Sequence, residues 1–114
     1  MATFLPQELS GGANGVNILI DDTATEGKLI HTAVSGTTNW DELDLKIANI
    51  DTVARKATLE WSGATIPIEI WVPAEAGFVP LVQGLRLRNG GTVKVFADTI
   101  NVLIVNGVCN RYTA

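Results

Sequence analysis

The stretch GLRLRNGGTVKVFADTINVLIVNG, residues 84–107, alternates apolar and polar side chains on both sides of an Asn-Gly-Gly turn. The alternation predicts that Leu85 and Leu87 face a core while the arginines beside them face outward. Residues 89–91 can adopt the positive φ angles that a tight hairpin turn requires. Residues 100–107, INVLIVNG, are apolar at nearly every position, which indicates a strand covered on both faces. The stretch therefore predicts a hairpin beside a central strand.

The same period of two continues through most of the chain from Lys28 onward. Residues 39–50, NWDELDLKIANI, place Leu43, Leu45 and Ile47 on one side, although an Asn followed by acidic residues would also suit the start of a helix. The strict alternation favours a strand. The segments ARKATLEWS and TIPIEIWVP alternate in the same way and place these side chains inward: Ala57, Leu59, Trp61, Ile66, Ile68, Ile70 and Val72.

These patterns predict an all-β protein with one antiparallel β-sandwich or jelly-roll-like domain. Seven or eight short strands, separated by turn signals, are expected over residues 28–114. GFVPLVQGLRLR contains a proline and a glycine, so it is expected to form two short strands or one bent strand. Residues 1–27 are expected to be an extended N-terminal arm with one short strand near residues 16–21. An ordinary first strand with a frayed end fits that segment equally well.

The composition excludes several classes of function. The chain has 114 residues, a net charge of −4 and eight scattered basic residues, so no surface for nucleic acid is expected. No apolar run reaches the roughly 18 residues of a membrane span, and the N-terminus lacks the features of a secretory signal. The single cysteine, Cys109, excludes an intrachain disulfide and any cysteine-based zinc site. A reducing cytoplasm is the expected place of assembly.

No catalytic or cofactor motif stands out. His31 is the only histidine; it is expected to share a strand face with Leu29 and Ala33 and to be structural. The acidic groups at 21–22 and 41–44 do not match a calcium loop, and the glycine-rich segments lack the ending of a phosphate loop. We therefore expect no enzymatic activity, no cofactor and no metal.

Aromatic and charged side chains on outward positions are the candidate contact residues. Trp71 and Glu69 fall on the outward face of their strand, and Phe96 is outward by the same alternation. An outward tryptophan indicates that something covers it. Two coverings are possible, the N-terminal arm or a neighbouring subunit. The full set of candidate interface residues is Trp71, Phe96, Glu69, Arg86, Arg88 and Trp40, the arginines being included because they lie nearby in sequence and suit protein interfaces.

Two stretches carry a family resemblance: NWDELDLKIANIDTVARKATLEWSG and GLRLRNGGTVKVFADTINVLIVNGVCNRY. Their order of strands and turns resembles the small β-sandwich virion proteins of tailed bacteriophages over residues 28–114. The resemblance implies a non-enzymatic capsid decoration (cement) protein that is located in the virion and assembled in the host cytoplasm. It further implies a trimer that binds the major capsid protein or another virion protein, with the N-terminal arm reaching neighbouring capsomers.

Other functions remain open at this point. A tail or neck component and a fibre or spike base would fit the resemblance as well. A carbohydrate-binding module would instead use Trp71, Trp40 and Phe96 as a platform on which sugar rings stack.

Overall fold

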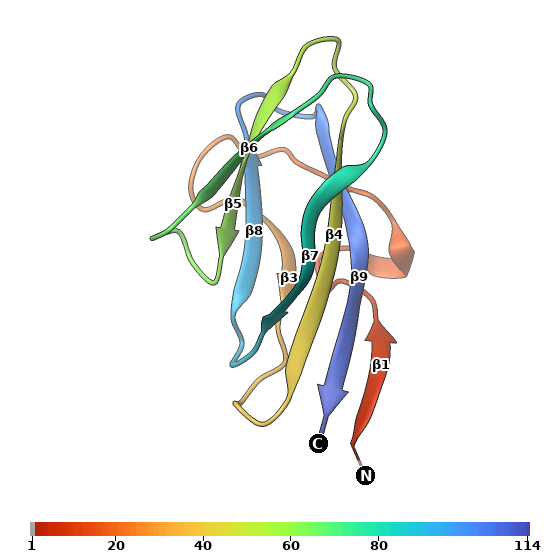
Figure 1. The fold of residues 1–114 in the computed structure, drawn as a ribbon. Helices are drawn as coiled ribbons and strands as arrows, with labels where there is room; N and C mark the ends of the chain where they lie inside the picture. Colours follow the sequence, from red (N-terminus) through yellow and green to blue (C-terminus); the bar gives the residue numbers. More distant parts are fainter. Residues whose placement is uncertain (1) are drawn as a thin grey trace.

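The computed structural model describes residues 2–114 and contains two antiparallel sheets that face each other (Figure 1). Sheet A has the strand order β1-β9-β4-β7, with β2 also beside β9. Its strands are β1 (Thr3–Gln7), β2 (Ile18–Leu19), β4 (Trp40–Asn49), β7 (Val79–Leu87) and β9 (Leu103–Thr113). Sheet B has the order β3-β8-β5-β6. Its strands are β3 (Lys28–Thr32), β5 (Arg55–Trp61), β6 (Ile68–Val72) and β8 (Thr92–Ala97).

This architecture confirms the predicted all-β sandwich. Residues 40–49 form a strand and not the alternative helix. Residues 28–114 contain seven strands, as expected, and the described residues before them contribute two strands where one was expected. Apart from strands, the described part of the chain contains one short 3₁₀ turn, η1 (Ala13–Gly15). None of the residues 2–114 belongs to a helix that is long and apolar enough to cross a membrane.

The core lies between the two sheets and follows the predicted alternation. β4, central in sheet A, buries Leu43, Leu45 and Ile47, and the facing strands of sheet B bury Leu59 and Val95. Three residues predicted to face the core do not. Ile66 precedes β6 and is 80% exposed, while Ile68 and Leu85 are each 47% exposed because they lie on strands at the margins of their sheets. The sandwich is therefore well filled in its centre and less well covered along β6 and β7.

β7 is one bent strand, which is one of the two possibilities predicted for this segment. Its pairing with β4 shifts register twice, between Leu43 and Lys46. Gly84 has a φ of +65°, a conformation that glycine adopts without strain, and its amide donates to Asp44 Oδ1 at 2.7 Å. β7 runs beside β4 at the edge of sheet A, and its C-terminal end bends toward the start of β8 (Figure 1).

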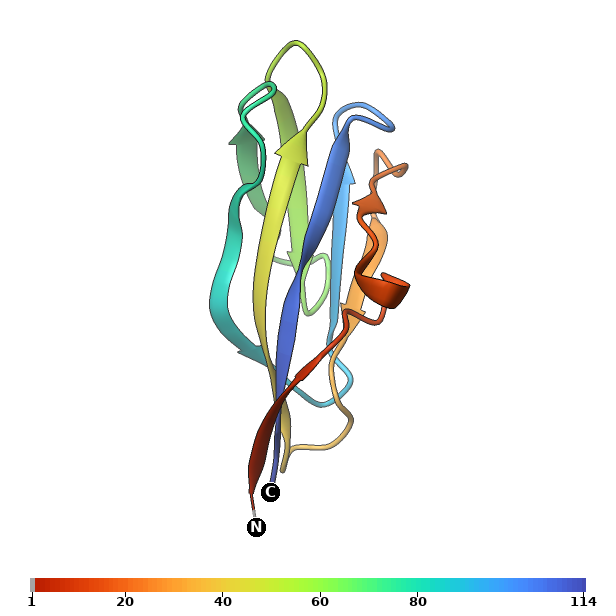
Figure 2. The ribbon, with the colours of Figure 1, turned by 90° about the vertical axis from the view of Figure 1, so that its right-hand side faces the viewer.

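The described part of the N-terminal segment, residues 2–27, runs along the sandwich. β1 pairs with the C-terminal part of β9, so the first and last strands lie side by side (Figure 2). All five residues of β1 are exposed. Further along, Leu9 and Ile20 are buried in the core, and the Gly11 amide donates to the Ile30 carbonyl of β3. The segment thus combines a peripheral strand with residues that complete the core.

A buried polar cluster and the candidate contact surfaces

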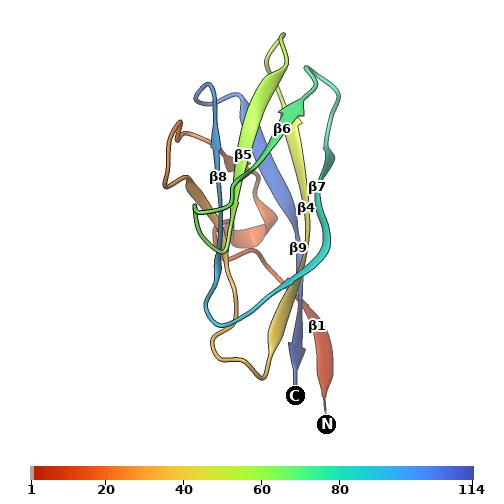
Figure 3. The ribbon, with the colours of Figure 1, turned by 60° about the vertical axis from the view of Figure 1, so that its left-hand side comes forward.

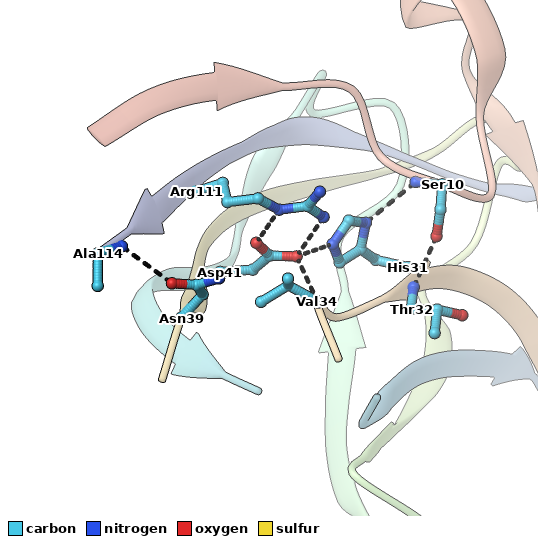
Figure 4. Close-up of polar contacts among 8 residues, drawn as sticks. All are labelled: Ser10, His31, Thr32, Val34, Asn39, Asp41, Arg111 and Ala114. Carbon is cyan, nitrogen blue, oxygen red and sulfur yellow. Dashed lines mark hydrogen bonds and ion pairs between the residues drawn. The ribbon is translucent and has the colours of Figure 1, made fainter. Parts of the chain in front are cut away.

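A buried carboxylate joins strands of both sheets (Figure 4). Asp41, at the start of β4, is fully buried. It accepts hydrogen bonds from Arg111 of β9, through Nε at 2.8 Å and Nη2 at 3.0 Å. It also contacts His31 Nε2 of β3 at 2.7 Å and accepts the Val34 amide at 3.1 Å. The charge of Asp41 is therefore matched by one arginine and fully hydrogen-bonded, which a buried ion requires.

The contacts of His31 fix its role. The Ser10 amide donates to His31 Nδ1 at 3.0 Å, so this nitrogen is an acceptor and the ring hydrogen lies on Nε2, which donates to Asp41. The Ser10 hydroxyl oxygen accepts the Thr32 amide at 2.6 Å. A serine, a histidine and an aspartate do meet here, but both ring nitrogens are engaged and the serine contributes its main-chain N–H. The cluster is built to hold strands together, and it lacks a base that could activate a nucleophile.

The sequence prediction for the surroundings of His31 was partly wrong. His31 and Ala33 are buried, but Leu29 is exposed. The pairing of β3 with β8 shifts register between Leu29 and His31. This irregularity interrupts the alternation, so both Ile30 and His31 turn into the protein.

The cluster sets the protonation of three groups. Burial acts to raise the pKa of Asp41, but the hydrogen bonds and charge of Arg111 and the contact with His31 outweigh it, and the pKa lies below its ordinary value. The hydrogen bond that Arg111 donates to Asp41 raises the pKa of Arg111. Burial, followed by the charge of Asp41, raises the pKa of the Cys109 thiol to about 12. The cysteine is therefore a protonated, apolar part of the core at neutral pH.

The same cluster contains the only group of three potential metal-binding residues found within residues 2–114. The ligand atoms of His31, Asp41 and Cys109 all lie within 4.8 Å of one another. Their chemistry does not fit a metal ion. A thiolate would be needed where the pKa favours the thiol, His31 has no unoccupied nitrogen, and the Arg111 guanidinium already neutralises Asp41.

The structure places the six candidate interface residues on two different sheets. Trp71 and Glu69 lie on β6 and Phe96 on β8, all in sheet B. The other three, Trp40, Arg86 and Arg88, belong to or directly follow strands of sheet A. Proximity in sequence was therefore a poor guide to which residues share a surface. Trp71 is 65% exposed, so the N-terminal segment does not cover it, whereas Phe96 is half-buried.

The aromatic group on sheet A is a closed stack. The rings of Trp40 and Tyr112 are parallel, with centroids 3.9 Å apart and an interplanar angle of 10°. The Arg86 guanidinium lies 4.9 Å from the centroid of the Trp40 ring. Because β4 lies between β9 and β7, the tyrosine and the arginine approach Trp40 from opposite sides. Both faces of the Trp40 ring are thus occupied, which leaves no face for a sugar. Arg88 donates to the Thr37 carbonyl at 2.7 Å.

The apolar margin of sheet B is the most exposed of the candidate surfaces. We call Ile66, Ile68, Glu69 and Trp71 the β6 margin; all four are exposed, and Ile66 and Trp71 are 80% and 65% exposed. Sequence alternation identified Trp71, but it predicted Ile66 and Ile68 to be buried. The prolines that flank the strand, Pro67 and Pro73, were the available signal that β6 lies at the margin of a sheet.

Comparison with known proteins adds no further identification. No protein-family model, curated protein or solved structure matches the chain.

Proposed function

We propose that this protein is a non-enzymatic structural component of a tailed-phage particle, most specifically a capsid decoration protein that binds and stabilises the head lattice. The observation that carries the proposal is the β6 margin, an exposed and largely apolar surface that suits contact with another protein. The resemblance of residues 28–114 to small virion sandwiches supports the same role. The proposed partners are further copies of the chain and the major capsid protein, in virions assembled in the host cytoplasm.

The structure suits a role in which many copies each make modest contacts. The core is continuous across both sheets, so the surfaces are held on a rigid support. On a lattice, each additional contact of a bound copy is effectively intramolecular, so weak contacts add up to firm attachment. A tail, neck or spike-base position would use the same physical properties.

Binding to particles tests the proposal directly. Purified protein is mixed with phage heads assembled without it, and bound protein is measured by co-sedimentation. We expect saturable binding that Trp71→Ala weakens at least tenfold, since an exposed aromatic anchor contributes strongly to an interface. Phe78→Ala is the matched control, because Phe78 is exposed but lies outside the β6 margin. Absence of binding by the unaltered protein to heads, tails and complete virions would overturn the proposal.

The solution mass tests the implied trimer. Light scattering after size exclusion, at several concentrations, should give a species near three times 12.1 kDa. A strict monomer would contradict a trimer formed before attachment.

A truncation can separate the N-terminal strand from the core. Removal of the first 14 residues would delete Leu9, which is buried, and Ser10, which binds His31. A chain that begins at Glu8 removes only the exposed β1 and its pairing with β9. If this strand reaches a neighbouring capsomer, the shorter truncation should reduce binding to heads and leave the fold intact.

A carbohydrate-binding module is the second candidate, and the exposed ring of Trp71 favours it. Trp40 cannot contribute a stacking face because Tyr112 and Arg86 occupy both sides of its ring. A glycan array separates the two functions. Glycan binding that is lost in Trp71→Ala would favour the module, and it would predict no binding to particles without surface sugars.

A further inference from the structure

The two margins of sheet B differ in their main-chain contacts. Residues 9–12 run along β3, where the Gly11 amide donates to the Ile30 carbonyl and the Thr32 amide to the Ser10 hydroxyl. β6 pairs with β5 on one side only (Figure 3). No hydrogen bond joins its outer side to any other residue of 2–114. β6 is thus an open edge, and such edges are templates for another strand.

The ladder of β5 shows which groups of β6 point outward. The Asp98 amide donates to the Lys56 carbonyl, so the Lys56–Asp98 pair is hydrogen-bonded to β8. In an antiparallel sheet successive residues bond to opposite neighbours, so Ala57 and Leu59 bond to β6. Their partners there are Ile70 and Ile68. The main-chain groups of the intervening residues, Glu69 and Trp71, therefore point away from β5 and have no hydrogen-bond partner among residues 2–114.

Prolines delimit this open edge. The next outward positions are residues 67 and 73, and both are proline, which has no N–H to donate. The edge consequently offers only two donors, the amides of Glu69 and Trp71. Both prolines are exposed, as are Glu69 and Trp71. A partner strand of any length can therefore accept main-chain hydrogen bonds only from the amides of Glu69 and Trp71.

We infer that two copies of this chain associate through β6, antiparallel and about a two-fold axis at Ile70. In this register Glu69 of each copy faces Trp71 of the other, and each pair exchanges two hydrogen bonds. All four outward amides are then satisfied, and the prolines pair with each other at the two ends. The two sheets B become one sheet of eight strands.

The side chains select this register over its neighbours. Sliding the strands by two residues in one direction would place the two Glu69 carboxylates directly opposite each other, which is unfavourable. Sliding them in the other direction would move Ile68 beyond the partner strand. In the register centred on Ile70, the exposed Ile68 lies across from Val72 of the second copy and is covered. This contact has two-fold symmetry, so it is distinct from the trimer contact in the proposed function and does not depend on a virion role.

Glu69→Pro tests the main-chain pairing. The Glu69 amide points outward, so proline removes an intermolecular donor and no bond within sheet B. Glu69→Ala is the control, because it removes the same side chain but keeps the N–H. We expect light scattering to show that the mass of the unaltered protein and of Glu69→Ala doubles as the concentration rises, from three copies to six where the trimer of the proposed function forms and from one copy to two where it does not. For Glu69→Pro this doubling should be at least tenfold weaker. Equal association of both variants, with unchanged urea unfolding, would overturn the inference.

A cysteine scan tests the register. Across a non-hydrogen-bonded antiparallel pair the Cα atoms are about 4.5 Å apart, within reach of a disulfide. Ile70→Cys should therefore give a disulfide-linked dimer when it is treated with oxidised glutathione. Ile68→Cys should stay monomeric, because four residues of strand, about 13 Å, would separate its two copies along the sheet. The native Cys109 is buried and does not interfere. Equal cross-linking of both variants, or none with Ile70→Cys, would overturn the register, and a mass that does not double at any concentration would overturn the contact itself.

Discussion

The two margins of sheet B show how one sheet can be finished in two ways. At β3, the N-terminal segment supplies main-chain partners and the Asp41 cluster fixes the strand to sheet A. At β6, prolines and exposed apolar side chains border an edge without a partner in residues 2–114. The sheet edge that is covered within the chain thus uses buried polar groups and close main-chain contacts. The edge that is left for another molecule is instead short and bordered by apolar side chains.

The comparison leads to different expectations for mutation. At the β3 margin, each group has several partners, so changes there should affect the stability of the monomer. At the β6 margin, the side chains have few contacts within the chain, so changes there should affect association. The following changes are ordered by their expected effect on the free energy of unfolding.

Asp41→Ala should have the largest effect. It removes the acceptor for Arg111, His31 and the Val34 amide and leaves a guanidinium without its partner. Breaking a buried ion pair in this way costs about 3–5 kcal/mol. Urea unfolding at pH 7 measures the loss. Glu69→Ala is the control at the other margin; it removes an exposed ion pair with Lys56 and should change stability by less than about 1 kcal/mol. Similar losses for the two variants would contradict the assigned role of the cluster.

Trp61→Ala and Trp71→Ala compare two tryptophans on neighbouring strands. Trp61 packs against the core from β5, so its truncation should cost about 3 kcal/mol. Trp71 is largely exposed, so its truncation should change the stability of the monomer by about 0.5 kcal/mol or less. Thermal unfolding at a concentration below association measures both. A large loss for Trp71→Ala would show that the β6 margin supports the monomer.

Acid should weaken the β3 margin selectively. The pKa of Asp41 in the folded protein lies below its ordinary value, near 3.9 in an unfolded chain. The stabilisation is therefore fully present above about pH 4 and is lost as the pH falls through the lower folded pKa. Urea unfolding between pH 7 and pH 2 should show this loss. Asp41→Asn should be less stable at pH 7 but lose less stability on acidification than the unaltered protein. Parallel pH profiles would contradict this assignment.

The sequence predicted the regular part of the molecule well. Alternation at Leu43, Leu45 and Ile47 identified β4 because a central strand has one covered face and few irregularities. It failed at His31 and at Ile68 for two physical reasons. A register shift in β3 changes which side chains turn inward, and a strand at a margin can leave its inward face uncovered. Neither the register shift nor the placement of a strand at a sheet margin depends on the residue type at the affected position.

The polar cluster was beyond prediction for a different reason. Asp41 and Arg111 are 70 residues apart in the chain, and they meet because β4 and β9 pair in register at these positions. In the sequence, Asp41 stood out only as part of the acidic group at 41–44, and an aspartate is seldom fully buried. The candidate contact surface was predicted only in part. The outward position of Trp71 was predicted correctly, but Arg86 and Arg88 were grouped with it although they belong to the other sheet.

Gly11→Ala tests how closely the N-terminal segment lies against β3. A Cβ at this position would collide with the main-chain carbonyls of Leu29 and Ile30, which are parts of a paired strand and cannot turn away. Overpacking of this kind costs about 1–3 kcal/mol. The expected result is a local opening: amide hydrogen exchange at residues 9–12 and at Thr32, whose amide donates to Ser10, should accelerate more than exchange in β5. Ser10→Ala serves as a reference, because it gives the faster exchange at Thr32 that follows from loss of its acceptor without any collision. If Gly11→Ala leaves exchange at Thr32 unchanged, the segment holds β3 less tightly than its contacts indicate, and the contrast between the closed and the open margin would be smaller in solution than in the structure.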